Sequence, residues 1–396
     1  MKYLVCNAGS TSLKFKLYEM PQQDVLSTGK VERVRSTTDA IFHYENCITK
    51  EKIKLESQSI PDYAEGINKY LSCLLSASVG VLNTLDDIVC VCFKSVLSKG
   101  FYGVHELTDE VLAGMEEMLP VAPAHNIPYL EVIRLMKKLV PGARLIGSFE
   151  TAFHTTIPLE RRLYGAPYEW YEKYGMMRMG YHGASHRYVS EKAAELLGCR
   201  NFKMISCHLG GSSSLCAVQD GRSVDTSFGL SLQTGVIQAE RTGDFDTFAV
   251  PYLMEKGLSL DEIFTQLSKN GGLKGLSGVS GDLRQVQEAA DAGNERARLA
   301  IKVYVNGLIK TIGAFYAELG GLDAIAFAGG IGENSSMLRQ RVCGALRHLG
   351  IKLDVVANEQ NRTVISSPDS TVKVFVIPTD EEAIVSKQAF EYLAEH

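Results

Sequence analysis

No stretch of the sequence is apolar for long enough to cross a bilayer. Before Asn7 there are one lysine and a short apolar run, Tyr3–Cys6, which is shorter than the hydrophobic core of a signal peptide. We therefore expect a cytoplasmic protein without a membrane partner.

An excess of basic residues is also lacking, because 41 Lys and Arg are outnumbered by 46 Asp and Glu, for a net charge of -5. That balance gives no electrostatic footprint for nucleic acid or for an anionic membrane surface. Any anion-binding site must then be local and built from a few placed groups.

Paired CxxC modules are absent among the nine cysteines, several of which lie in apolar runs such as Val89–Cys92. This pattern indicates buried thiols in a reducing cytosol.

What the sequence does contain is enough material for two domains, since 396 residues that are 45% hydrophobic and 22% charged can bury a large core. The boundary is predicted near Glu150. Residues 1–149 would form the first domain, to which the C-terminal helix 383–396 is expected to return, and residues 150–382 would form the second.

A tight hairpin is predicted near the start of the chain, where strand-like Tyr3–Cys6 and Leu13–Leu17 flank a turn rich in Gly and Ser. The same plan recurs at 204–218. The residues that match Cys6, Gly9 and Ser12 are Cys207, Gly210 and Ser213.

This repetition predicts an α/β fold that occurs twice in the chain, and two such halves are expected to enclose a ligand cleft. A hairpin turn needs two suitable residues, whereas a phosphate cradle needs several hydroxyls and N–H groups that face one anion. Two copies in matching phase therefore favour a phosphate grip over an ordinary turn for Asn7–Ser12 and its partner.

Other elements are predicted from periodicity and turn residues. Helical patterns lie at 62–75 and 129–138, and a turn with a short buried strand lies within 140–149. A last strand, 374–377, is expected to lead into a helix whose first turn contains the carboxylates of 380–382.

A glycine-rich turn is predicted at Gly329–Asn334, between a strand at 324–327 and a helix that begins near Ser336. It lacks the GxGxxG spacing of dinucleotide-binding folds and it is not a Walker A loop. A glycine C-cap and a nucleotide contact remain alternatives for this segment.

Two further segments also allow alternative interpretations. His182 and His186 lie four residues apart without an HExxH glutamate or a third ligand, so a helix cap plus a packed histidine is favoured over zinc. Arg241 lies beside Gly243 in an acidic loop, which fits a surface salt bridge and a fixed cation for phosphoryl transfer equally well.

Together these segments resemble the acetate kinases, a family in the superfamily of sugar kinases, actin and heat-shock ATPases, from residue 1 to about 390. The motifs that carry the resemblance are Asn7–Lys14, Ala122–Asn126, Phe149–His154, Tyr181–His186, His208–Gly210, Gly330–Asn334 and Pro378–Glu382. The resemblance implies an α/β chain with a duplicated actin-like (ribonuclease H-like) ATPase fold, in which two domains surround a nucleotide cleft.

The resemblance also implies reversible phosphorylation of a short-chain carboxylate, such as acetate or propionate, by ATP, giving an acyl phosphate and ADP. A carboxylate is already a nucleophile, so catalysis would depend on positioning and on charge neutralisation by cations and Mg²⁺, with Mn²⁺ as an alternative metal. The implied assembly is a homodimer built through the second domain.

The site residues implied by the resemblance come from both halves of the chain. The catalytic set is Glu150, His182, Arg241 and His125. The metal ligands are Asn7 and Glu381. The acyl pocket is lined by Lys94, Val96, Ala124 and Leu232. The nucleotide is bound by Ser10, Ser12, Lys14, His208, Leu209, Gly210, Gly211, Ser212, Asp282, Leu283, Arg284, Gly330, Ile331, Gly332, Glu333 and Asn334.

Several positions depart from the family pattern. Lys94 replaces a substrate-binding arginine and loses its bidentate fork, and Glu150 replaces an aspartate. Gly211-Ser212 replaces Asn-Gly in the second hairpin. Ala124 and Leu232 replace a leucine and a proline, which changes the shape of the predicted acyl pocket.

These departures motivate two alternatives. The first is a divergent paralogue with a different acceptor or with a nucleotide-binding role of reduced activity. The second is a sugar or alcohol kinase in which Glu150 acts as a base, and Gly183–His186 and Pro378–Glu381 argue against it.

Overall fold

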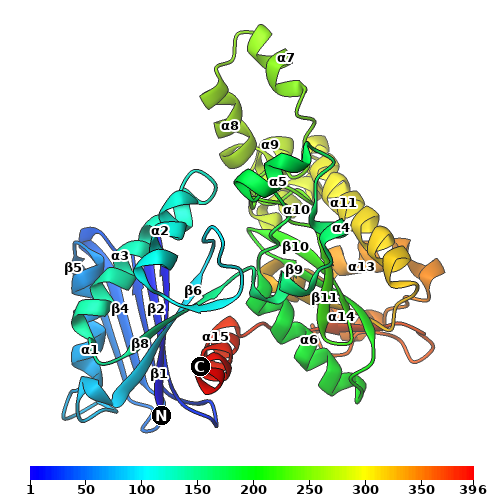
Figure 1. Ribbon diagram of the computed structural model, residues 1–396. Helices are drawn as coiled ribbons and strands as arrows, with labels where there is room; N and C mark the ends of the chain where they lie inside the picture. Colours follow the sequence, from blue (N-terminus) through cyan, green and yellow to red (C-terminus); the bar gives the residue numbers. More distant parts are fainter. The chain divides into compact units, whose positions relative to one another are not determined.

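The computed structural model describes residues 1–396, apart from the side chain of Ala124. The chain forms two compact units (Figure 1). Unit 1 comprises Met1–Ala152 and Asp380–His396, and unit 2 comprises Phe153–Thr379. Each unit contains one sheet, of eight strands in unit 1 and five in unit 2.

The sheet of unit 1 has the strand order β5-β4-β3-β2-β1-β6-β8-β7. Its strands are β1 Lys2–Gly9, β2 Ser12–Glu19, β3 Asp24–Glu32, β4 Ser36–Asn46, β5 Lys52–Ile60, β6 Ile88–Ser95, β7 Val104–Glu106 and β8 Arg144–Phe149. The first five strands form an antiparallel meander, and β6 and β8 add to β1 in parallel.

Helices cover both faces of this sheet. They are α1 Tyr63–Leu74, α2 Asp109–Glu117, α3 Pro123–Leu139 and α15 Glu381–Glu395. Tyr70 of α1 stacks on Phe15 at 4.4 Å between ring centroids, and Phe390 of α15 lies 6.0 Å from Tyr3. Phe15 pairs with an even-numbered residue of β1, and side chains alternate between faces, so α1 and α15 lie on opposite faces.

The sheet of unit 2 has the strand order β11-β10-β9-β12-β13. Its strands are β9 Lys203–Leu209, β10 Ser213–Gln219, β11 Arg222–Thr226, β12 Ala324–Ala328 and β13 Lys373–Val376. Its helices are α4 Leu159–Arg162, α5 Tyr168–Tyr174, α6 Gly183–Leu197, α7 Ala249–Glu255, α8 Leu260–Lys269, α9 Gly272–Ser277, α10 Leu283–Asp291, α11 Glu295–Leu319, α12 Gly329–Asn334, α13 Ser336–Ala345 and α14 Val355–Glu359.

Two apolar cores enclose this second sheet. On one face Val189 of α6 packs in a cluster with Met204 of β9. On the other, Tyr304 of α11 packs in a cluster with Ile205. Adjacent residues of β9 therefore face opposite cores, which explains why this strand is buried almost throughout.

The two sheets repeat one topology. In both, the first three strands form an antiparallel meander, and two further strands add in parallel to the first strand of that meander. Cys6 lies beside Phe93 in one sheet, and Cys207 lies beside Phe327 in the other. The predicted duplication of an α/β fold is confirmed.

The two hairpins differ at their turns, so the predicted match is wrong there. β1 extends through Gly9, which pairs with Ser12 and leaves a two-residue connection. In the second hairpin Leu209 pairs with Ser213, and Gly210 lies in a three-residue connection. The two hairpins match along their first strands, where a parallel neighbouring strand fixes the register. They differ at their turns, which have no such neighbour.

Three predicted element boundaries also need correction. The helix expected at 129–138 begins at Pro123, because proline is well suited to a first helical turn, and Pro128 lies within it. Gly329–Asn334 is a short helix, α12, rather than a turn. The predicted hairpin strands are longer, so Asn7 lies within β1. No helix among the described residues is both long and apolar enough to cross a membrane.

Candidate functional site

The first hairpin is held by residues outside the motif. Tyr63 donates its hydroxyl hydrogen bond to the carbonyl oxygens of Gly9 at 2.8 Å and Ser10 at 3.2 Å. The carbonyl of Thr11 accepts from the Val34 N–H at 3.0 Å. A Cβ on Gly9 would lie 2.7 Å from Ser12 Oγ, so a larger residue would displace that hydroxyl. The turn is thereby anchored through its carbonyl groups.

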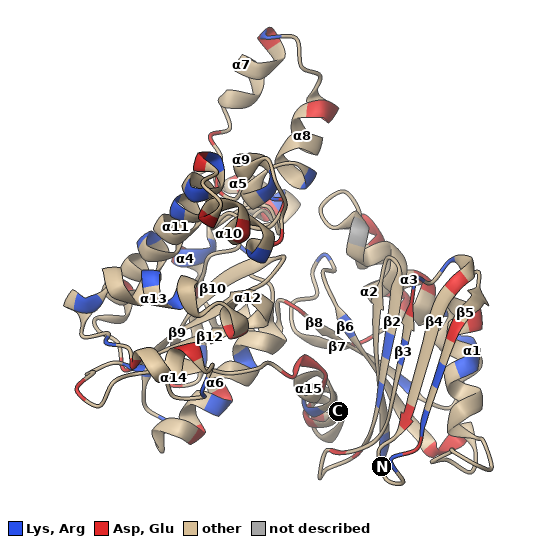
Figure 2. Cartoon of the chain, turned by 180° about the vertical axis from the view of Figure 1, so that it is seen from behind, with Lys and Arg blue, Asp and Glu red and all other residues tan. Residues whose placement is uncertain are grey.

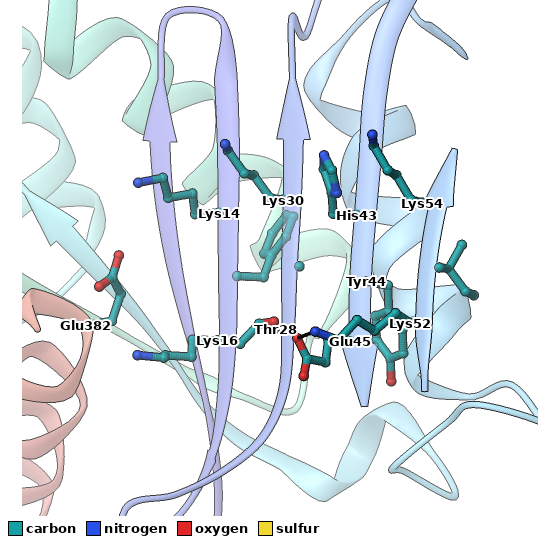
Figure 3. A pocket seen from close by; sticks show the side chains of 13 residues that line it. Lys14, Lys16, Thr28, Lys30, His43, Tyr44, Glu45, Lys52, Lys54 and Glu382 are labelled. Carbon is teal, nitrogen blue, oxygen red and sulfur yellow. Dashed lines mark ion pairs between the residues drawn. The ribbon is translucent and has the colours of Figure 1, made fainter. Parts of the chain in front are cut away.

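Next to this hairpin, the face of β2–β5 opposite α1 carries a lysine-rich groove of about 440 Å³ (Figure 3). Most of its lysines are neutralised, because the ion pairs are Lys16–Asp380, Lys30–Glu32, Lys52–Glu45 and Lys54–Glu56. Among the described residues Lys14 is the only lysine of the groove without an ion pair, and it lies opposite Asn7 in the ladder. The groove is therefore largely a salt-bridged surface rather than a broad anion site.

A buried polar cluster forms where β6, β8 and α15 approach one another in unit 1. Lys94 Nζ lies 3.0 Å from Glu150 Oε1 and also forms an ion pair with Glu381. Burial alone would lower the pKa of the Lys94 ammonium, but the charges of Glu150 and Glu381 outweigh burial, and this pKa is raised well above its ordinary value. Lys94 is therefore a fixed cation between two carboxylates.

Asn7 is connected to the same cluster through Tyr129. The Tyr129 hydroxyl donates a hydrogen bond to Asn7 Oδ1 at 2.8 Å. Burial raises the pKa of Tyr129 and the nearby Lys94 charge opposes this, so the phenol stays protonated as a donor. The structure thus brings together Asn7, Lys94, Glu150 and Glu381, four residues that sequence analysis assigned to metal, substrate and catalysis.

The start of α3 is fixed to the loop after β6. Asn126 donates two hydrogen bonds from Nδ2, to the carbonyl of Leu97 at 2.9 Å and to that of Met115 at 2.8 Å. This anchor fixes the backbone on which His125 lies. Val96 is buried in the anchored loop, and the side chain of Ala124 lies outside the described residues.

In unit 2, His182 occupies the N-cap position of α6 with a left-handed backbone, φ 57°. Its side chain makes no capping hydrogen bond, so the predicted helix cap is correct for the position and wrong for the side chain. Nδ1 is instead hydrogen-bonded to Ser214 Oγ at 2.8 Å, and the ring lies 4.2 Å from that of His208. A left-handed conformation is unfavourable for a histidine and is maintained where the surroundings fix it.

Arg241 lies in the same unit, where its guanidinium contacts the second hairpin. Its Nη1 donates to Ser212 Oγ and to Gln238 Oε1, each at 3.2 Å. Gln238 is buried and donates to the carbonyl of Leu232 at 2.8 Å. Of the neighbouring acids, Glu240 pairs with Lys274 at 3.1 Å. Hydrogen bonds therefore link the Arg241 guanidinium to the second hairpin and, through Gln238, to Leu232.

A pocket of about 940 Å³ lies within unit 2. Eight residues of the predicted nucleotide set line it: Gly210, Gly211, Asp282, Leu283, Arg284, Gly330, Ile331 and Asn334. Five others are not among its lining residues: His208, Leu209, Ser212, Gly332 and Glu333. Glu333 Oε1 accepts the N–H of Gly329 at 2.9 Å, so this carboxylate caps its own helix.

The wall of this pocket depends on close backbone approach. Gly329 has φ +74°, and a Cβ there would lie 2.7 Å from the carbonyl oxygen of Leu209. At the facing end, Asp282 caps α10 by accepting the Arg284 N–H at 2.9 Å, and the side-chain hydrogen bond from Arg284 lowers the pKa of that carboxyl. The glycine-rich start of α12 and the Asp282–Arg284 ion pair thus line one space.

No group of three or more His, Cys, Asp or Glu side chains among the described residues is arranged to hold a metal ion. Oxygen ligands are nevertheless present in unit 1, in the amide of Asn7 and the carboxylate of Glu381. Mg²⁺ in phosphoryl-transfer sites commonly binds through one or two carboxylates plus substrate phosphates, so this donor set fits it.

Comparison with known proteins extends over the whole chain. Residues 2–387 match the Acetokinase family. An acetate kinase from Carboxydothermus hydrogenoformans is 41% identical, with 99% of each chain covered.

The chain belongs to the acetokinase family.

Solved structures of the family agree with this assignment. Porphyromonas gingivalis acetate kinase matches with a TM-score of 0.87 at 38% identity over 99% of each chain. A propionate kinase from Francisella tularensis subsp. tularensis matches with a TM-score of 0.88 at 31% identity over 98% of each chain. The fold is therefore the duplicated actin-like fold of acetokinases.

As a member of the acetokinase family, the protein is a phosphotransferase that uses ATP and has a carboxyl group as acceptor. The relatives favour neither the nucleotide-binding paralogue nor the alcohol kinase.

Three residues that contact the candidate site residues were missed in the sequence analysis. Tyr129 holds Asn7, Gln238 joins Arg241 to Leu232, and Ser214 binds His182. Gln238 precedes Arg241 by three residues, so its nearness was a usable signal. Tyr129 and Ser214 come from other elements, and only the folded chain places them beside their partners.

Proposed function

We propose that the protein phosphorylates a short-chain carboxylate, acetate or propionate, with ATP and Mg²⁺, and that the reaction is reversible. The observation that carries this proposal is the match to acetate and propionate kinases over nearly the whole chain. The site geometry supports it, since unit 1 holds an ammonium group beside carboxylate and amide oxygens, and unit 2 holds a pocket and a hydrogen-bonded guanidinium.

Unit 2 would bind the nucleotide. Its 940 Å³ pocket lies within the size range of small-molecule sites. The residues we assign to ATP contacts there are the eight that line it, from Gly210 to Asn334. The remaining predicted residues, such as Leu209 and Gly332, would act by shaping the strand and helix that carry the contacts.

Unit 1 would bind the acceptor and the metal, with Lys94 as the cation for the carboxylate. Asn7 and Glu381 would hold Mg²⁺, which when bound neutralises charge on the phosphates. Ser10, Ser12 and Lys14 would contact phosphate oxygens. Lys14 is suited to this role because it alone among the lysines of its groove has no ion pair within the described residues.

Charge neutralisation would be the main catalytic contribution of this chain. Because a carboxylate needs little help from a general base, Arg241 would neutralise the oxygens of the phosphoryl group in transfer, and His125 and His182 would donate hydrogen bonds to them. Ser212 and Gln238 hold the Arg241 guanidinium at 3.2 Å before any ligand binds. Glu150 would position Lys94 rather than remove a proton.

An acyl-hydroxamate assay with Mg-ATP over acetate, propionate, butyrate and substituted acids tests the proposal. We expect acetate or propionate to give the highest kcat/KM. Omission of the divalent cation should abolish product, and Mn²⁺ should restore part of it. If a longer or substituted acid is preferred by tenfold or more, the acceptor assignment is wrong even though the enzyme class holds.

We propose in addition that two copies associate through unit 2. Helices α7 and α8 project from the rest of that unit (Figures 1 and 2). Large apolar side chains on and beside them are exposed, with Phe248 at 79%, Tyr252 at 58% and Phe264 at 55%. Exposed aromatic groups at this density are typical of a surface that another protein covers.

A further inference from the structure

Four histidines gather in unit 2 between α6 and the second sheet. The ring of His182 lies 4.2 Å from that of His208 and 6.4 Å from that of His186, and His154 lies 5.8 Å from His186. His154 and His186 are fully buried, and the reaction described above uses neither. Buried histidines outside the chemistry require a structural or positioning explanation.

A continuous chain of hydrogen bonds runs through this cluster. His182 Nδ1 is bonded to Ser214 Oγ at 2.8 Å, and Ser214 Oγ is bonded to His186 Nε2, also at 2.8 Å. His186 Nδ1 is bonded in turn to Ser206 Oγ at 2.9 Å. A single hydroxyl therefore joins the ring nitrogens of two histidines, and a second hydroxyl binds the far nitrogen of the buried ring.

His186 carries one ring proton. Burial lowers the pKa of His186 well below its ordinary value, and the charges of His154, His208 and His182 lower it further. In a neutral imidazole one nitrogen donates and the other accepts. Each serine hydroxyl has one proton to donate. The direction of one hydrogen bond in this series therefore fixes the direction of the next.

The proposed position of His182 beside the phosphoryl group determines the donor and the acceptor in each of these hydrogen bonds. If the Ser214 hydroxyl donates to His182 Nδ1, Ser214 Oγ accepts from His186 Nε2–H, and His186 Nδ1 accepts from the Ser206 hydroxyl. His182 then carries its proton on Nε2 and can donate to a phosphoryl oxygen. The reverse direction would place a lone pair of Nε2 against that anion, which is unfavourable.

We propose that Ser206, His186 and Ser214 form a positioning relay that fixes the His182 ring in the tautomer protonated at Nε2. The proposal rests on the proposed role of His182 beside the phosphoryl group. It assigns Ser214 and His186 as positioning residues that act through His182. The neighbouring His154 is excluded from the relay, because its nitrogens are bonded to Ser223 Oγ at 2.9 Å and to the Tyr181 carbonyl at 3.0 Å.

The experiment compares Ser214→Ala, Ser206→Ala and Ser190→Ala in the full-length protein labelled with ¹⁵N-histidine. Ser190 is the matched control, since it is a buried serine of α6 whose hydroxyl has no hydrogen-bond partner among the described atoms. We expect the wild type to show one His182 tautomer, protonated at Nε2. Ser214→Ala should give a mixture of tautomers, Ser206→Ala should shift the His186 signals, and Ser190→Ala should change neither.

Kinetics provide the second readout. Ser214→Ala should lower kcat on the order of 10- to 100-fold, while KM for ATP changes less than about threefold, as for the loss of a group that orients a catalytic histidine. Ser214→Thr, which keeps a hydroxyl, should restore most of the lost activity and the single tautomer. The Ser214→Thr variant also tests the relay if Ser214→Ala does not fold.

The outcomes separate the two proposals. An unchanged His182 tautomer in folded Ser214→Ala, or a wild-type ring protonated at Nδ1, would overturn the relay. A tautomer shift in a protein that phosphorylates no carboxylate would support the relay and overturn the proposed function. Loss of activity in Ser190→Ala equal to that in Ser214→Ala would show a packing effect and overturn the relay.

Discussion

At the residue scale, the contact between Lys94 and Glu150 explains two departures from the family pattern together. A lysine is shorter than an arginine, whereas a glutamate is one methylene longer than an aspartate, and their charged atoms meet at 3.0 Å. Each exchange alone changes the reach of one side chain, but in this chain the two side chains meet in one ion pair. Two departures that seemed independent in the sequence therefore form one matched interaction.

This matching predicts a strong coupling between the two positions. Lys94→Arg alone should lower kcat/KM for acetate, because the wider guanidinium does not fit against Glu150, and Glu150→Asp alone should lower it by breaking the contact. The double variant should regain much of the loss, with a coupling free energy of about 1–3 kcal/mol. Steady-state kinetics of the wild type, the two single variants and the double variant measure this coupling free energy. Lys16→Arg, whose partner is Asp380, is the control. Additive losses would contradict the matching.

The buried ring of His186 should make the free energy of unfolding depend on pH. Its folded pKa lies well below 6.5, so below that pH the unfolded state binds a proton that the folded state does not. The stabilising contribution is complete above pH 6.5 and is lost as the pH falls. Between pH 7.5 and 5.5, we expect urea unfolding of the wild type to lose roughly 1 kcal/mol more than His186→Asn does. His348→Asn, at an exposed position, should follow the wild type.

Residue types and spacing could predict which side chains take part in the site, but not their partners. Asn7, Lys94, Glu150 and Glu381 were assigned from separate segments, and the structure joins them in one cluster. The phenol of Tyr129 and the amide of Gln238 carry no motif. Their roles depend on distances between elements that only the packed sheet and helices determine.

At the element scale, α12 shows why a glycine-rich segment was hard to assign. Gly329–Asn334 is rich in glycine, which disfavours a helix, yet it forms one because both of its ends are satisfied by other groups. Glu333 accepts the N–H of Gly329 at 2.9 Å. The buried Arg339 of α13 donates to the carbonyls of Gly332 at 2.7 Å and Glu333 at 3.0 Å. Tertiary contacts therefore override the weak local preference.

Arg339→Met should consequently destabilise the protein by about 2–4 kcal/mol, because it leaves two helix carbonyls and the side chain of Asn358 without their charged donor. Burial lowers the pKa of Arg339 to about 10, so it is still charged at neutral pH. Urea unfolding measures the loss, and calorimetry should show weaker ATP binding, since α12 lines the pocket. Arg341→Met, exposed on the same helix, should change stability by less than about 0.5 kcal/mol. Equal effects in both variants would contradict the role of Arg339.

At the scale of the whole molecule, duplication was the most predictable feature. The repeated cysteines, Cys6 and Cys207, mark strands that occupy the same central place in the five-strand order that the two sheets share. Central strands are constrained on both faces and by parallel neighbours, so their sequence pattern persists. The turns and surface helices are constrained less, and there the two halves differ in length.

Association of two copies through α7 and α8 predicts a defined change in mass. Phe248→Ser combined with Phe264→Ser should shift the protein from dimer to monomer in light scattering coupled to size-exclusion chromatography, because burial of those exposed rings would drive the contact. Val355→Ser with Val356→Ser, exposed on α14 of the same unit, is the matched control and should remain dimeric. A dimer that persists in the phenylalanine variant would place the interface elsewhere, and a monomeric wild type would contradict the proposal.

Helices α7 and α8 directly follow the loop that contains Arg241 in the chain. A monomer with reduced kcat and unchanged ATP affinity would therefore indicate that association of two copies orders this loop.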